Sequence, residues 1–216
     1  MLNSFQVSSI TAFALNLLLG IAVYLMNPGR RANRCFLITS LAIASWLCCF
    51  MLVPFASGRE DLLRLMRYSG VASGVLPMAF DLLRHSIMHE TEKRRDLLRT
   101  LMPWFFTIPA VTLISFHASF VLDVDMSRAG FPMPIHGHGQ VLYAIISAGT
   151  VLLFAKRFIS DFRSAQGIKR EELGFNVLAS VLFAISALSL GQVVPAVTGQ
   201  RQVLSRQGTP EILGRG

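Results

Sequence analysis

The sequence predicts an all-α protein, a polytopic bundle of about six transmembrane helices with its N-terminus outside the cell. The first observation behind this prediction is composition. Hydrophobic residues make up 53% of the 216 residues and charged residues only 15%, whereas globular proteins have roughly 45–50% and 25%. Sixteen phenylalanines and nine methionines add more apolar surface than a core of this size can enclose. We therefore expect lipid to solvate much of that surface.

The second observation is that the apolar residues gather in runs long enough to cross a bilayer. The six runs lie at about 8–26, 35–55, 68–83, 101–122, 139–155 and 174–197. A helix needs about 20 residues to cross a hydrocarbon core of roughly 30 Å, and four of the runs meet that length comfortably. The third and fifth are shorter, but they end at Arg84 and at Lys156–Arg157, whose long side chains can reach the headgroups.

The third observation is the placement of lysine and arginine in the connections between these runs. Thirteen of the twenty fall in residues 27–34, 84–100 and 156–173, which would share one face of the membrane. The positive-inside rule assigns that face to the cytoplasm. Residues 56–67 and the N-terminus are therefore expected outside.

The charges also indicate which partner they meet. The net charge is +8, but it lies in short connections, so we expect anionic lipid headgroups and no nucleic acid as the partner. In the first connection, the cations expected at the headgroups are Arg30, Arg31 and Arg34.

Polar residues inside the runs are the first candidates for function, because each is costly in lipid and tends to face the bundle. Asp81 is followed by Arg84 and His85, which a helix places on the same face. We interpret this as a local ion pair, with a proton-linked switch as the alternative. Asn16 is expected to hydrogen-bond between helices.

A ligand site, if the bundle has one, is expected at its outer end. The amphipathic groups there are Tyr68, His117, Phe120 and Tyr143, with His117 and Phe120 placed in the fourth helix. An apolar cleft with few polar anchors suits a small hydrophobic ligand. The alternative is that these residues pack the bundle and anchor it at the interface.

No residue pattern indicates catalysis, a metal or a cofactor. The outer connection contains Asp123, Asp125, His136 and His138, which are metal-binding types. They lie in a Gly- and Pro-containing segment without defined spacing, so we interpret it as a solvated loop. Glycine-rich phosphate loops and hydrolase signatures are absent from the sequence. We therefore predict that the chain is not an enzyme.

One segment resembles a known family. Asn27–Pro28, then Asn33–Arg34 with Phe36, then Ala42 and Trp46 are similar to the first loop and second helix of the seven-transmembrane sensor region of bacterial membrane histidine kinases. Pro77–Phe80 and the basic connection after the fifth run match less specifically. The resemblance covers about residues 5–197, and it implies a sensor region that lacks the family's seventh helix and kinase.

The resulting hypothesis is a multi-pass protein of the bacterial inner membrane that senses a signal and passes it to a kinase or another output protein. Residues 1–197 would form the sensor-like domain, and residues 198–216 a polar, disordered tail. Two alternatives stay open: a small multispan carrier or transporter subunit, and a non-functional truncated fragment.

The orientation can be tested by labelling single cysteines in intact cells, after Cys35, Cys48 and Cys49 have been replaced by serine. A membrane-impermeant thiol reagent should label a cysteine within 56–67 and should leave one within 89–99 unlabelled until the cells are opened. Labelling within 89–99 in intact cells would contradict the assignment.

Overall fold

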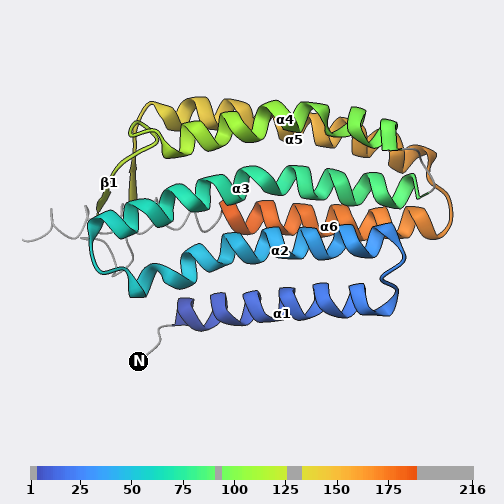
Figure 1. Ribbon diagram of the computed structural model, residues 1–216, viewed down its shortest axis with the longest axis horizontal. Coiled ribbons are helices and arrows are strands. Elements are labelled where there is room, and N and C mark those ends of the chain that lie inside the picture. Colours follow the sequence, from blue (N-terminus) through green and yellow to red (C-terminus); the bar gives the residue numbers. More distant parts are fainter. Residues whose placement is uncertain (1–3, 91–93, 126–132, 189–216) are drawn as a thin grey trace, which may run out of the picture.

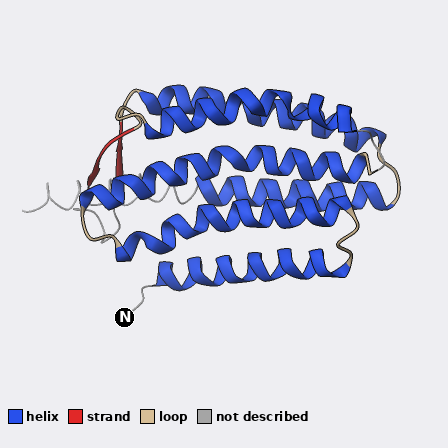
Figure 2. Cartoon of the chain, viewed as in Figure 1, coloured by secondary structure: helices blue, strands red, loops and turns tan. Residues whose placement is uncertain are grey.

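The computed structural model describes residues 4–90, 94–125 and 133–188, which form six α-helices, one short 3-10 helix and one two-stranded hairpin (Figures 1 and 2). The helical prediction is therefore confirmed. In chain order the elements are α1 (Ser4–Met26), α2 (Arg31–Leu52), η1 (Val53–Phe55), α3 (Arg59–Met88), α4 (Arg94–Phe116), β1 (Val121–Asp125), β2 (Met133–His136), α5 (Gly139–Ser164) and α6 (Ile168–Leu188).

The helices run up and down along one long axis (Figure 1). The connection 27–30, the end of α3 and the connection 165–167 lie at one end, which we call the basic end. η1, the start of α3 and the hairpin lie at the other, which we call the hairpin end. The described parts of the three segments predicted to share one face of the membrane therefore do lie at one end of the bundle.

Four of the described helices are long and apolar enough to cross a membrane: Val7–Met26, Arg31–Phe55, Leu97–Phe116 and Gly139–Ser164. α1 shows the expected lipid-facing character, because Leu15, Leu18 and Leu25 are each more than 60% exposed. The predicted third and sixth spans differ. The charges of α3 lie within residues 59–67 and at Asp81 and Arg84, on either side of an uncharged stretch, and α6 carries Lys169–Glu172 directly after its first residue. The predicted sixth run also extends beyond the described residues.

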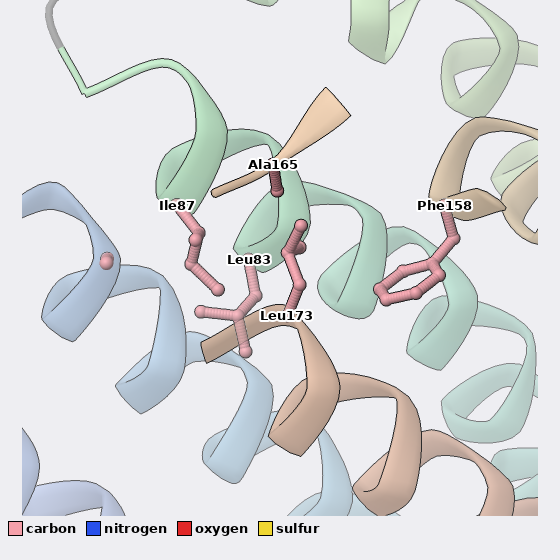
Figure 3. Close-up of a cluster of buried hydrophobic side chains, with 6 residues drawn as sticks. Leu83, Ile87, Phe158, Ala165 and Leu173 are labelled. Atoms are coloured by element: carbon pink, nitrogen blue, oxygen red, sulfur yellow. The ribbon is translucent and has the colours of Figure 1, made fainter. Parts of the chain in front are cut away.

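α3 is the centre of the bundle even though it is the least apolar of the six described helices. It packs against α2, α4, α5, α6 and β1, and each of the three buried apolar clusters contains residues from it. The cluster nearest the basic end joins Leu83 and Ile87 of α3 to Phe158 and Leu173 (Figure 3). Because its neighbours surround it, α3 can hold charge that a lipid-facing helix could not.

Small residues and amide side chains bring the helices close together. A Cβ on Gly74 would lie 2.3 Å from Val111 Cγ1, so this glycine lets α3 approach α4. Small residues at such contacts are typical of closely packed membrane helices. Asn16 Nδ2 donates to Ser40 O at 2.7 Å, which confirms the predicted interhelical hydrogen bond and places it between α1 and α2.

The outer connection differs from the prediction. The fourth apolar run does not stay helical to residue 122, since α4 ends at Phe116. After a turn at residues 117–120, Val121–Asp125 pairs antiparallel with Met133–His136. The apolar Val121 and Leu122 continue the run in composition, which conceals the change from helix to strand. The described residues 121–125 and 133–136 of the connection are therefore paired strands, where we expected a solvated loop.

Candidate functional site at the basic end

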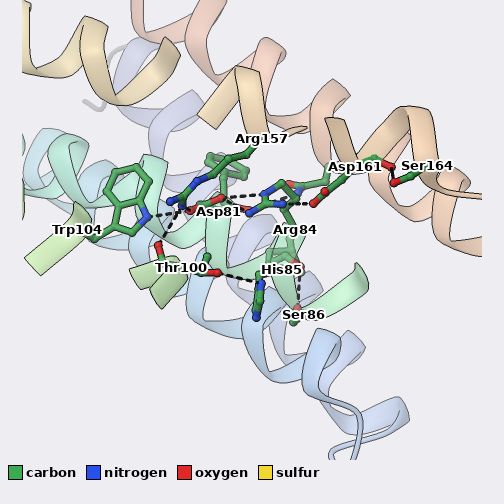
Figure 4. A network of polar contacts seen from close by, with 12 residues as sticks. Asp81, Arg84, His85, Ser86, Thr100, Trp104, Arg157, Asp161 and Ser164 are labelled. Atoms are coloured by element: carbon green, nitrogen blue, oxygen red, sulfur yellow. Dashed lines mark hydrogen bonds and ion pairs between the residues drawn. The ribbon is translucent and has the colours of Figure 1, made fainter. Parts of the chain in front are cut away.

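The most unusual group in the bundle is the carboxylate of Asp81, which is fully buried in the last third of α3, toward the basic end. Its Oδ1 accepts hydrogen bonds from Arg84 at 2.8 Å. Its Oδ2 accepts from Trp104 Nε1 of α4 at 2.9 Å and from Arg157 Nη1 of α5 at 2.6 Å (Figure 4). The predicted ion pair with Arg84 is therefore confirmed, but it is one part of a larger network.

The two arginines extend this network to a second aspartate and to the backbone. Arg84, whose side chain is 5% exposed, also pairs with Asp161 of α5. Arg157 Nη1 donates in addition to Thr100 O of α4 at 3.0 Å. We call Asp81, Arg84, Arg157 and Asp161 the ionic network. Its two cations balance its two anions, as buried charge requires, and it joins α3, α4 and α5.

The ionic network lies at moderate depth in the bundle. Asp81 precedes the last residue of α3, Met88, by seven residues, which corresponds to about 10 Å along a helix. His85, which the sequence placed on the same face, is buried one turn nearer the basic end, and its Nδ1 lies 3.4 Å from Thr100 Oγ1. A shift of α3 against α5 would therefore break charged contacts inside the bundle.

A second set of ion pairs joins the connections at the basic end itself. Arg30 donates to both carboxylate oxygens of Glu172 in α6, at 2.7 and 2.8 Å, and to Glu90 after α3 at 3.2 Å. The hydrogen bonds with Glu172 raise the pKa of Arg30 above its usual value. We call Arg30, Glu90 and Glu172 the loop clamp. Lys169 Nζ also donates to Met88 O at 3.0 Å, so the ends of α3 and α6 are held together.

The loop clamp modifies the role expected for the first basic connection. Arg30 was predicted at the headgroups, yet its guanidinium is engaged by two glutamates of the chain. Arg34 Nε donates to Pro28 O at 2.7 Å, which closes the turn. Headgroup contact by Arg31 and Arg34 stays a prediction.

A hollow opens beside the ionic network, between α3, α4 and α5 at the basic end. Its volume is about 590 Å³, and we call it the basic hollow because cations and histidines dominate its wall. Its lining consists of Arg84, His85, His89, Arg99, Thr100, Leu153, Lys156, Arg157, Ser160 and Asp161. In the sequence, Arg99, Lys156 and Arg157 indicate only membrane topology, since nothing in their spacing shows that they face one another.

The four residues predicted to line an outer ligand cleft are divided between the interior and the surface. Phe120 is buried and its ring lies 5.0 Å from that of Tyr143. The Tyr143 hydroxyl donates to Gly70 O at 2.8 Å and lies 2.7 Å from Ser73 Oγ. These contacts agree with the alternative prediction, that such residues pack the bundle.

The other two predicted cleft residues lie at the surface of the hairpin end. Tyr68 is 51% exposed and meets Phe116 edge to face, with ring centroids 5.4 Å apart. His117 is exposed just beyond α4, where its Nδ1 lies 2.8 Å from Ser119 Oγ; its predicted place within the fourth helix is therefore wrong. A ligand role for these residues stays a prediction.

An ion pair connects the hairpin to α3. Asp123 of β1 pairs with Arg59 at the start of α3, which fastens the hairpin to the central helix. Within residues 4–90, 94–125 and 133–188, no three His, Cys, Asp or Glu side chains gather as a metal site would require.

Comparison of the chain with protein-family models, curated proteins and solved structures found no match.

Replacing Asp81 by asparagine tests the ionic network. The variant Asp81→Asn keeps the shape but leaves the buried Arg84 and the partly buried Arg157 with one aspartate, and breaking a buried pair costs about 3–5 kcal/mol. The midpoint of SDS-induced unfolding in dodecylmaltoside micelles should fall accordingly. Glu60→Gln is the control, because Glu60 and Arg64 form an exposed pair at 3.8 Å and such pairs contribute little. Equal midpoints for both variants would contradict a structural role for Asp81.

Proposed function

We propose that the chain is a six-span protein of the bacterial inner membrane, with its N-terminus outside and its basic end in the cytoplasm, and that it acts as a signal-input module. Four long apolar helices support the membrane environment. The meeting of the basic connections at one end supports the orientation, because the positive-inside rule acts on such connections. The local resemblance of residues 27–46 to the sensor region of membrane histidine kinases agrees with this proposal.

The observation that carries the proposal is the position of the ionic network relative to the loop clamp. Both involve α3: the network holds it to α4 and α5, and Glu90 of the clamp follows its last turn. Charged hydrogen bonds tolerate little displacement, so the bundle should have a few discrete packings in place of a continuous range. A change of packing near the network would then move the cytoplasmic connections.

An output partner would bind at the basic end and respond to the change of packing there. A ligand or a change in the membrane would favour one packing by its differential affinity for it. The connections 27–30 and 165–167 would carry that change to a separate or attached signalling protein, and the chain itself would need no catalytic group.

The proposal requires two packings, which paired spin labels can detect. We would label Gly29→Cys and Gln166→Cys, both in exposed connections at the basic end, in the full chain with its three native cysteines replaced. Pulsed electron resonance in lipid nanodiscs should show two distance populations. Asp161→Asn should change their ratio, because it weakens the bond between α3 and α5 without removing Asp81.

Glu60→Gln at the hairpin end is the matched control and should leave the ratio unchanged. A single distance population that stays the same in Asp161→Asn would contradict the proposed function.

A carrier is the second candidate, and the ionic network favours it specifically, because ionisable groups at membrane depth often mark proton or ion pathways. Proteoliposomes containing a pH-sensitive dye separate the two functions. A proton leak above that of empty liposomes, abolished by Asp81→Asn, would support a carrier. A leak equal to that of empty liposomes would support the input module.

A further inference from the structure

We propose that the basic hollow binds the phosphate group of an anionic phospholipid. This inference depends on the membrane location of the bundle and is independent of whether the bundle receives a signal. It follows from three features of the hollow: the charge of its wall, its depth, and the apolar surface that continues from it.

The wall of the hollow has excess positive charge. Four cations, Arg84, Arg99, Lys156 and Arg157, line it, against the single lining carboxylate of Asp161. With the buried Asp81 behind the two arginines included, four cations face two anions, a net charge of +2. Among the described side chains at the hollow, two positive charges therefore have no counterion.

Those two charges belong to side chains that form no ion pair in the described structure. Arg99 on α4 and Lys156 on α5 are exposed, and neither forms an ion pair within the described part of the chain. Arg157 makes its bonds to Asp81 and Thr100 through Nη1, so its remaining N–H groups can also face a ligand. Guanidinium and ammonium groups arranged in this way match the oxygens of a phosphate.

The depth of the hollow suits a lipid headgroup. Arg99 lies five residues after the first residue of α4, and Lys156 lies eight residues before the last residue of α5. At 1.5 Å per residue these positions are about 8 and 12 Å from the helix ends, which is the interfacial layer of a spanning bundle. Basic pockets between helices at this level bind anionic headgroups.

The apolar surface beyond the hollow distinguishes a lipid from free phosphate. Leu153 lines the hollow, and a neighbouring depression on α5 shares Lys156 and Ser160 with it and adds Leu152 and Ala155. Leu152 is 69% exposed and lies deeper in the membrane than Lys156. An acyl chain can therefore follow α5 from the phosphate toward the bilayer centre.

Native mass spectrometry of the full chain in detergent micelles tests the inference. The probes are dioleoylphosphatidylglycerol and dioleoylphosphatidylcholine, which share acyl chains and differ in headgroup charge. The wild-type chain should retain the anionic lipid about tenfold better. Arg99→Gln with Lys156→Gln should remove this preference, while gel filtration and helix content stay unchanged.

The matched control removes the same charge elsewhere. Arg64→Gln with Arg170→Gln changes two exposed arginines outside the hollow and should keep the preference. An unchanged preference in the Arg99 and Lys156 variant would overturn the proposal. Displacement of the lipid by millimolar inorganic phosphate would overturn the lipid assignment in favour of a free phosphate ligand.

Discussion

The pairing of Asp81 is the constraint on which the rest of the bundle depends. A carboxylate with no solvent exposure stays in place only if cations and hydrogen-bond donors surround it. Its partners come from its own helix, from α4 and from α5, so satisfying this one group fixes three helices relative to one another. α3 must then be central, since only a helix covered by its neighbours can hold such a group in a membrane.

The same constraint links the packing of the bundle to its surface at the basic end. Because Arg84 and Arg157 are engaged with aspartates, they hold the wall of the basic hollow in place, while Arg99 and Lys156 remain available to a ligand. The loop clamp lies just beyond the last residue of α3 and connects that end of the helix to α6. A lipid in the hollow and a partner at the connections would therefore act on one connected set of helices.

The sequence predicted the interactions that local spacing determines and missed those that depend on tertiary contacts. Asp81 and Arg84 are three residues apart, so helical geometry alone brings them together. Trp104 and Arg157 reach Asp81 from other helices, and no spacing rule connects those positions. The hairpin was missed because Val121 and Leu122 are as apolar as the helix before them, so hydropathy alone does not show where α4 ends.

A double-mutant cycle between Asp81 and Arg157 tests whether the ionic network holds the bundle together. The quantity measured is the free energy of unfolding in micelles. Asp81→Asn, Arg157→Gln and the combined variant would be compared with the wild-type chain. If the two side chains form the bond that holds α3 to α5, the cycle should show a coupling energy of about 1.5 kcal/mol or more. Effects that add within about 0.5 kcal/mol would contradict the central role of the ionic network.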